Sequence, residues 1–347
     1  MFMQRYSNQR IVYLDLLRVI ATFIVIFRHV CSIEFYHSPL SLDWCIASIY
    51  NFLVPKAAPI FVMISGALLL NPYKEVTYRD ILKKRIPRLL LVYVFWALLY
   101  VLYGFALRGF NEFTLWRLFR RAIVIPCVHL WFLPMLMGVY LLTPVLRKIA
   151  KDNKLLHYVL IIWIVYVFVS FFQFVEAFQL VRHFYSLFNM NIIIGFSGYF
   201  LLGYFLSRHN FSKRQRIWFY LLGIAGASVI IFATFHIAVS TGEANERYFT
   251  NLSVQVVAMA TALFVLVKEL APKCGTQTLK FVDFVRKDLF GIYLTHMLWV
   301  PIVNTTTLRH CCSEVITLPL IAIIVFLLSL FTTKLIRLVP GLRKVVE

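Results

Sequence analysis

The first apolar segment of the chain contains charged and titratable side chains that could do chemistry inside a membrane. Asp15, Arg18 and His29 interrupt a run that is otherwise hydrophobic. Because an α-helix turns by about 100° and rises about 1.5 Å per residue, Arg18 and His29 lie within about 20° of one another and about 16 Å apart. Asp15 and Thr22 fall close to the same stripe. This polar face predicts a cavity within a helix bundle, since a membrane-buried charge must be paired or face a polar ligand.

Each of these residues also has a purely structural interpretation. An Asp15–Arg18 pair spaced i,i+3 near one interface would neutralise both charges without serving any function. A single histidine is more often a packing or interfacial residue than a catalytic one. Alternatively, a neutral imidazole at His29 would accept a proton from a substrate hydroxyl near physiological pH. The residues of this segment alone leave both interpretations open.

A cluster of basic residues follows the second apolar segment, in the sequence Lys83-Lys84-Arg85-Ile86-Pro87-Arg88. Arginine forks bind phosphate groups bidentately, so a nucleotide or coenzyme A could dock there. Basic clusters beside a membrane more often set the topology or contact lipid headgroups. The cluster therefore supports a phosphate site only in combination with other features.

Other polar residues interrupt the apolar segments. Lys56, between Pro55 and Pro59, predicts a kink, and the Ser65-Gly66 pair predicts close packing of two helices. The sequence His129-Leu130-Trp131 is typical of an interfacial aromatic belt. His296 is polar within an apolar span and could line the same cavity as the first helix.

The composition excludes a water-soluble globule. Of the 347 residues, 61% are hydrophobic and 14% are charged, and the mean hydropathy is +0.80. A net charge of +20 would suggest nucleic acid in a soluble protein, but here Lys and Arg lie in short clusters between apolar runs. We therefore predict the lipid bilayer as a partner and no nucleic acid. The six cysteines form no CxxC pair and no His/Cys ligand spacing, so no metal site is predicted; Cys31 and Cys45 could approach each other outside the membrane.

The predicted fold class is all-α, a polytopic membrane helix bundle of about ten transmembrane helices that forms one domain over residues 1–347, with no separate soluble domain. Ten apolar stretches are long enough to span about 30 Å of hydrocarbon. They are approximately 11–30, 44–70, 89–107, 123–145, 155–175, 190–207, 216–240, 250–270, 289–306 and 315–336.

Basic residues in the short connections predict the orientation, because Lys and Arg resist translocation. One side receives Arg5, Arg10 and the clusters at 74–88, 147–154, 208–216, 268–287 and 334–344. The other side receives residues 31–43, which contain Glu34 but no Lys or Arg, and residues 241–249, with one Arg. Both termini should therefore be cytoplasmic. Residues 108–122 carry four arginines yet fall on the outer side, either as an interfacial amphipathic segment or as a site for an anionic ligand.

Taken in order, these features resemble the acyltransferase-3 family of bacterial membrane O-acyltransferases. Asp15-Leu16-Leu17-Arg18, followed after ten residues by His29, is similar to the family's Arg-x10-His signature, and residues 61–66 resemble its Phe-x-x-Ile-Ser-Gly segment. Arg85-Ile86-Pro87-Arg88 resembles the Arg-x-x-Arg motif of the next cytoplasmic loop, and residues 291–296 resemble a late Gly-Ile-Tyr-Leu-x-His segment. Residues 129–133, with Tyr140 and Pro144, are similar to the branch that includes the enterobacterial common antigen O-acetyltransferase. The resemblance covers the whole chain.

The resemblance implies that the protein lies in the bacterial inner membrane and transfers an acyl group, most often acetyl, from cytoplasmic acyl-CoA to a hydroxyl of an envelope polysaccharide or lipid-linked glycan. It assigns catalysis to His29, as a general base or as an acyl relay. It assigns donor binding to Arg18, Arg85 and Arg88, and the basic cluster adds Lys84 to the candidate donor-binding residues. No permanently bound cofactor is expected, and acetyl-CoA or another acyl-CoA is the co-substrate.

The remaining candidate residues have less defined roles. We expect Asp15 and Ser65 to support the site, and His129, Trp131, His296 and Glu34 to lie on the acceptor side. Two other functions stay open: a transporter or flippase for a glycan or lipid-linked intermediate, and a scaffold for a glycan-synthesis complex. The sequence contains no signal for the oligomeric state.

Overall fold

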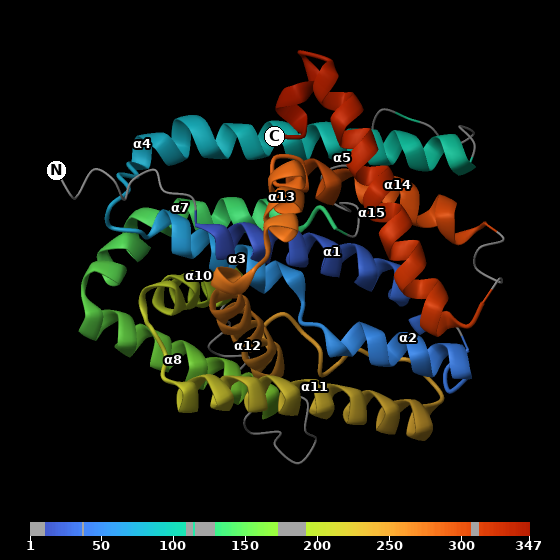
Figure 1. The fold of residues 1–347 in the computed structure, drawn as a ribbon, viewed down its shortest axis with the longest axis horizontal. Coiled ribbons are helices and arrows are strands. Elements are labelled where there is room, and N and C mark those ends of the chain that lie inside the picture. The colour runs from blue at the N-terminus through green and yellow to red at the C-terminus, as the bar shows by residue number, and fades with distance from the viewer. Residues whose placement is uncertain (1–10, 37, 109–113, 115–128, 173–191, 307–311) are drawn as a thin grey trace.

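The computed structural model describes residues 11–36, 38–108, 114, 129–172, 192–306 and 312–347, and these form helices and connections without any β-strand (Figure 1). The prediction of an all-α protein is confirmed for this part of the chain. The α-helices are α1 (Val12–Phe35), α2 (Leu42–Leu53), α3 (Ala57–Leu69), α4 (Tyr78–Asp80), α5 (Ile86–Arg108), α7 (Phe132–Lys151), α8 (Asn153–Phe172), α10 (Ile192–Arg208), α11 (Lys213–Thr241), α12 (Val254–Leu270), α13 (Thr276–Val285), α14 (Leu289–Asn304) and α15 (Glu314–Leu338). A π-helix, η2 (Ile81–Arg85), and two 3₁₀-helices, η4 (Ala271–Lys273) and η6 (Leu342–Val345), complete them.

Seven helical stretches within the described ranges are long and apolar enough to cross a membrane. They are Val12–Phe35, Leu42–Leu69, Tyr78–Ala106, Phe132–Lys151, Lys213–Thr241, Val254–Lys273 and Glu314–Leu338. Each of the ten predicted spans contains helix, but the stretches at Asn153–Val169 and Leu289–Asn304 are shorter. The arginine-rich segment at 108–122 lies almost entirely outside the described residues.

The second predicted span is broken rather than kinked. Val54 and Lys56 adopt extended backbone angles between α2 and α3, with φ −107° and ψ 142° at Val54 and φ −63° and ψ 131° at Lys56. Pro55 explains the break, because the residue before a proline is driven out of the α region and Pro lacks an N–H for the helix ladder. The prediction of a kink at Lys56 was therefore wrong in degree, and α3 has an N-terminus of its own inside the bundle.

Close packing at the Ser65-Gly66 pair is confirmed by the contact between α3 and α10. A Cβ atom added to Gly66 would lie 1.8 Å from the carbonyl oxygen of Phe200, and one added to Gly203 would lie 2.1 Å from that of Met63. The two backbones thus touch where both helices lack a side chain, as small residues allow in membrane bundles. This contact fixes α3 beside α10.

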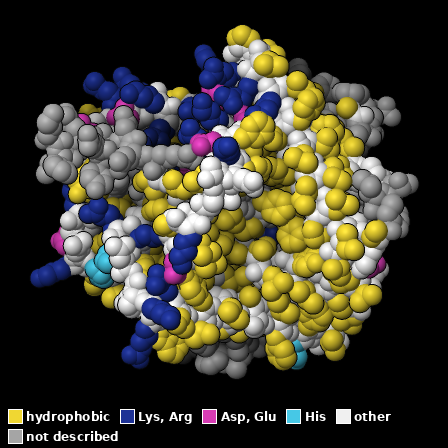
Figure 2. Space-filling view, viewed as in Figure 1, with side chains coloured by type: hydrophobic (Ala, Val, Ile, Leu, Met, Phe, Trp, Pro, Cys, Tyr) yellow, Lys and Arg dark blue, Asp and Glu magenta, His cyan; other side chains and the backbone are white. Residues whose placement is uncertain are grey.

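Helix α1 lies in the middle of the bundle, between α5 and α7 on one side and α11 on the other (Figure 1). It contacts α2, α3, α12, α14 and α15. Figure 2 shows a broad hydrophobic surface, with Lys and Arg gathered toward one part of it. Large apolar side chains are exposed along α11, among them Trp218, Leu222, Ile224 and Phe232. Lipid is the solvent that suits such a surface.

The basic segments meet at one end of the bundle, which we call the basic end. Arg147 on α7 donates to the carbonyl oxygen of Lys74 at 2.8 Å, and Lys268 on α12 donates to that of Ser207 at 3.0 Å. The opposite end joins the α2–α3 break to residues 242–253, where Lys56 lies 3.3 Å from Glu246. Helix α1 runs between the two ends. Cys31 on α1 is buried and Cys45 on α2 is half-buried, and no disulfide joins them.

Candidate active site

The polar face predicted for the first helix is present on α1. Nη1 of Arg18 lies 3.3 Å from Oδ1 of the buried Asp15, so the expected i,i+3 pair is formed. Arg18 and Thr22 line a cavity at the basic end, which we call the inner cavity. His29 lines a second cavity near the opposite end, which we call the outer cavity. One helix therefore contributes to both cavities.

The inner cavity has a volume of about 370 Å³ and collects most of the residues predicted to bind the donor. Arg18 comes from α1, Ser65 from α3, Arg85 from η2 and Arg88 from α5. The Arg85 guanidinium lies 6.0 Å from the ring centroid of Tyr140, whose hydroxyl is 3.4 Å from Ser65 Oγ. Glu347 also lines the cavity, and its carbonyl oxygen accepts a hydrogen bond from Arg88 at 2.8 Å. The three arginines outnumber this one acidic residue, so the cavity favours an anionic ligand.

The position of Lys84 differs from the prediction. Lys84 does not line the inner cavity: its side chain is 77% exposed, and its ammonium lies 2.6 Å from Asp80. The reason is local, because the helical turns of α4 and η2 place Asp80 and Lys84 on one exposed face at i,i+4. Lys74, in contrast, adds to the positive charge around Arg85 and Arg18. Burial and then the charges of these two arginines lower the pKa of Lys74 below its ordinary value.

The outer cavity, of about 310 Å³, brings three histidines together. The ring centroid of His296 on α14 lies 5.3 Å from that of His29 and 5.0 Å from that of His129, which precedes α7. His129 and His29 line the cavity together with Trp131, whereas His296 is fully buried behind them. The predicted acceptor-side residues from three distant segments thus meet at His29.

Three ring nitrogens of His129 and His296 could each make a further hydrogen bond. Neither ring nitrogen of His129, nor Nε2 of His296, has a hydrogen-bond partner among the described residues, although both side chains are buried. Nδ1 of His296 faces the carbonyl oxygen of Tyr293. Buried polar atoms in proteins are usually satisfied, so unpartnered nitrogens beside a cavity are expected where a ligand or ordered water binds.

A half-buried ionic cluster forms the rim of the outer cavity. Glu246 lies 3.3 Å from Lys56 and 3.8 Å from Arg28, and both cations sit over the ring of Phe249, at 4.7 and 4.3 Å from its centroid. Asn51 also donates to the Glu246 carboxylate at 3.3 Å. Burial raises the pKa of Glu246, but the charges of Lys56 and Arg28 and the hydrogen bonds outweigh it and hold this pKa below its ordinary value.

The N-terminus of α3 also lines the outer cavity. Lys56 is the N-cap residue, and its side chain makes no capping hydrogen bond. Ala57 and Ala58, the first two residues of the helix, line the cavity beside His29. The first-turn N–H groups of a helix have no partner within it and carry a partial positive charge. They can stabilise negative charge that develops on a ligand in this cavity.

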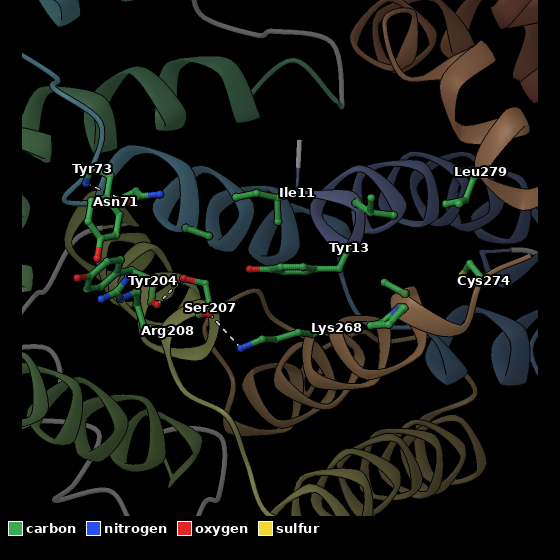
Figure 3. Close-up of a pocket in the computed structure, with 14 residues that line it drawn as sticks. Ile11, Tyr13, Asn71, Tyr73, Tyr204, Ser207, Arg208, Lys268, Cys274 and Leu279 are labelled. Atoms are coloured by element: carbon green, nitrogen blue, oxygen red, sulfur yellow. Dashed lines mark hydrogen bonds between the residues drawn. The ribbon is translucent and has the colours of Figure 1, made fainter. Parts of the chain in front are cut away.

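A third cavity, of about 730 Å³, lies at the basic end and contains none of the predicted site residues (Figure 3). Tyr13, Tyr73, Tyr204 and Arg208 line it. Its lysine, Lys268, is occupied by the carbonyl oxygens of Leu206, Ser207 and His209, at 2.8 to 3.0 Å. A cation in that position stabilises the C-terminus of α10, so the lysine of the third cavity already serves a structural role.

The acidic residue that lines the outer cavity was not among the predicted site residues. Glu34 does not line the outer cavity, and Glu246 lines it instead. Glu246 follows α11 in a loop whose pairing with Lys56 spans 190 residues, so no local periodicity could reveal it. The available signal was Lys56 itself, because a lysine within an apolar stretch requires a carboxylate partner. Arg28, next to His29, is a second cation in an apolar stretch and likewise requires a carboxylate partner.

Comparisons with known proteins agree with the motifs. The family model of the acyltransferase-3 domain, described as "Acyltransferase domain", matches residues 11–336. Curated relatives from Staphylococcus aureus strains MSSA476 and MW2 are each called "Probable poly-beta-1,6-N-acetyl-D-glucosamine export protein". Each is 23% identical over 293 residues, which cover 81% of this chain and 79% of the relative. No solved structure matches the chain. Because the family model covers nearly all of the sequence, this protein belongs to the acyltransferase-3 family.

Proposed function

We propose that this membrane acyltransferase moves an acyl group, acetyl in the first instance, from acyl-CoA in the inner cavity to a sugar hydroxyl in the outer cavity. One observation carries the proposal: the same face of α1 presents Arg18 to a cavity lined by arginines and His29 to a cavity lined by histidines. The acyl donor and the acceptor would then approach from opposite ends of the bundle.

The basic end would face the cytoplasm of a bacterium, where acyl-CoA is made, with the protein in the inner membrane. Clusters of Lys and Arg mark this end, as the positive-inside rule requires. A ten-helix topology with both termini in the cytoplasm is consistent with this placement. The diphosphate and phosphate groups of coenzyme A would bind Arg18, Arg85 and Arg88, with Lys74 adding to the positive field.

In the proposed reaction His29 is the general base. Its neutral imidazole takes the proton of the sugar hydroxyl, and the hydroxyl oxygen attacks the carbonyl carbon of the thioester. The C–S bond then breaks, the sulfur leaves as a thiolate and takes up the proton held by His29, and the products are the sugar ester and free coenzyme A. The first-turn N–H groups of α3 at Ala57 and Ala58 would stabilise the oxyanion of the intermediate.

An envelope glycan is the acceptor class that the outer cavity suits best. Trp131 and Tyr36 offer aromatic surfaces, while Glu246 and Asn251 offer polar groups to hydroxyls. The relatives are named for poly-β-1,6-N-acetyl-D-glucosamine, which points to a polymer of amino sugar as the first acceptor to test.

The test is transfer of radiolabelled acetyl from acetyl-CoA to poly-β-1,6-N-acetyl-D-glucosamine by the purified protein in lipid nanodiscs. We expect alkali-labile label on the glycan, and we expect His29→Ala to abolish it. His236→Ala is the matched control, because His236 lies exposed on α11 and lines neither cavity. Full activity of the folded His29→Ala protein would refute the assigned role.

Export of a glycan is the second candidate function, since the relatives' printed name specifies it. It predicts movement of the glycan across a sealed vesicle membrane in the absence of any acyl-CoA. Acyl transfer predicts no such movement and requires the thioester.

A further inference from the structure

Three aromatic side chains line both the inner and the outer cavity: Phe61 on α3, Phe132 on α7 and Tyr293 on α14. Their ring centroids form a triangle, with Phe61 and Phe132 5.8 Å apart, Phe132 and Tyr293 6.0 Å apart, and Phe61 and Tyr293 6.2 Å apart. These are contact distances for tilted rings, so the triangle leaves no open channel between its members. We call it the ring triangle.

The ring triangle lies between the charged end of α1 and His29. Thr22 lines the inner cavity and Val25 the outer, so the partition crosses α1 between these residues. His29 lies seven residues beyond Thr22, which is about 10 Å along the helix. An acyl group that starts beside Arg18 must therefore cross the ring triangle to reach His29.

The two phenylalanines are the parts of the triangle that can move. Tyr293 is fixed, because its hydroxyl donates to the carbonyl oxygen of His129 and its ring stacks on that of Phe290. Phe61 and Phe132 have no polar atom to hold them. A phenyl ring moves about only two side-chain torsions, so its rotation is the smallest movement that could open a passage.

A polar group, the hydroxyl of Thr22, lies on the inner side of the triangle. The Thr22 hydroxyl is buried, and its oxygen has no hydrogen-bond partner in the described part of the chain. A buried hydroxyl without a partner costs free energy that a ligand can recover. The amide and thioester carbonyls of an acylated pantetheine arm are acceptors that suit it.

We propose that the ring triangle is the passage through which the donor's acyl arm reaches His29, and that its bore decides which acyl group is transferred. The inference rests on the proposed acyltransferase function and adds to it a specificity determinant. A passage opened by one ring admits an acetyl group and excludes longer chains by steric clash with the other two rings.

The experiment supplies acetyl-CoA and butyryl-CoA at equal concentrations to the protein in nanodiscs, with poly-β-1,6-N-acetyl-D-glucosamine as acceptor, and measures both esters by mass spectrometry. Phe61→Ala and Phe132→Ala should raise the butyryl-to-acetyl ratio at least about tenfold, because methylene-sized changes in apolar pockets discriminate by such factors. Phe61→Trp should lower the ratio. Phe61→Leu, a milder truncation, should raise it less and serves if the alanine variants fail to fold.

Leu160→Ala is the matched control, since Leu160 is a buried residue of α8 that lines neither the inner nor the outer cavity. It removes apolar volume from the bundle away from the triangle and from both cavities, and it should leave the ratio unchanged. Acetyl transfer at an unchanged ratio in every folded ring variant would overturn the inference and leave the proposed function standing. No ester from any acyl-CoA, even with the unaltered protein, would overturn the proposed function and the inference together.

Discussion

Replacing Glu246 by glutamine tests what holds the outer cavity together. The carboxylate lies 3.3 Å from the Lys56 ammonium and 3.8 Å from the Arg28 guanidinium, and it accepts a hydrogen bond from Asn51. The side chains of Arg28, Lys56 and Glu246 are only 15%, 19% and 22% exposed. Glutamine keeps the size of the side chain and an oxygen for Asn51, but it leaves both cations without a counter-charge.

The expected loss is large because the cations stay buried. Removing one partner of a buried ion pair costs about 3–5 kcal/mol. The remaining exposure of these side chains allows water to reach them, so we expect about 3 kcal/mol. Because the entropy of unfolding grows with chain length, each kcal/mol lowers the Tm of a chain of 347 residues by about 1.4 °C. Glu246→Gln should therefore melt about 4 °C below the unaltered protein.

The same cluster predicts a pH dependence. Because the folded protein holds the pKa of Glu246 below its ordinary value, the folded state binds fewer protons at this group than the unfolded state. The stabilisation is complete above the ordinary glutamate pKa of about 4.3, and it is lost as the pH falls through the folded pKa. The Glu246→Gln variant should lose this acid-dependent part of its stability.

The assay is thermal unfolding in nanodiscs, followed by tryptophan fluorescence at one fixed scan rate because membrane proteins often unfold irreversibly. Glu243→Gln is the control, since Glu243 is an exposed residue of the same loop and its replacement should change stability by less than about 0.5 kcal/mol. Adding Lys56→Met to Glu246→Gln should restore about 1–2 kcal/mol, because it removes one of the two uncompensated cations.

Two results would refute this reasoning. The first is a Glu246→Gln protein that melts together with the Glu243→Gln control at pH 7. The second is a double variant with Lys56→Met that is no more stable than Glu246→Gln alone, since coupled charges must show a coupling free energy.

Three further predictions concern the reaction. His29→Gln should reduce acyl transfer to the level of His29→Ala with no change in Tm, because an amide cannot accept the hydroxyl proton; activity near that of the unaltered protein would exclude a general base there. Arg85→Gln should raise the KM for acetyl-CoA about tenfold, as expected for the loss of one charged phosphate contact. Lys84→Gln should leave this KM unchanged. Equal effects of the two substitutions would contradict the placement of the two side chains. Ala57→Pro should lower kcat about 10²-fold, which is the cost of one lost oxyanion donor. The helix should persist, because proline is favoured at its first position and Lys56 already has extended backbone angles. An unchanged kcat would show that this N–H takes no part in the mechanism.

Helical periodicity predicted the centre of this molecule well. The phase of Arg18 and His29 on one face of α1 followed from 100° per residue, and the two cavities along that face are what such a face requires. Ser65-Gly66 predicted the close contact of α3 with α10, because two small residues in an apolar span have few other uses. Both predictions rest on interactions within one turn or one helix.

Long-range pairing explains what sequence reasoning missed. The phosphate cluster predicted Lys84 and Arg85 equally, but the helical turns around η2 place Lys84 beside Asp80 and direct Arg85 to the cavity. Glu246 reaches the site only because α11 returns the chain to the end of α1, and the ring triangle joins α3, α7 and α14. The motif segments 61–66, 129–133 and 291–296 contain the three rings, but their meeting in space could not be predicted from the sequence, and Glu246 carries no periodic signal at all.

The ring triangle also bears on the choice between acyl transfer and export. Export along α1 requires a whole glycan to pass between α3, α7 and α14, so all three rings would have to separate together. Helix α3 resists this movement, because Gly66 and Gly203 hold its backbone against α10. Acyl transfer requires only that one phenyl ring rotate for a short chain, with the two substrates remaining in cavities of about 370 and 310 Å³. The close packing of the ring triangle therefore favours the proposed acyl transfer over export along this face of α1.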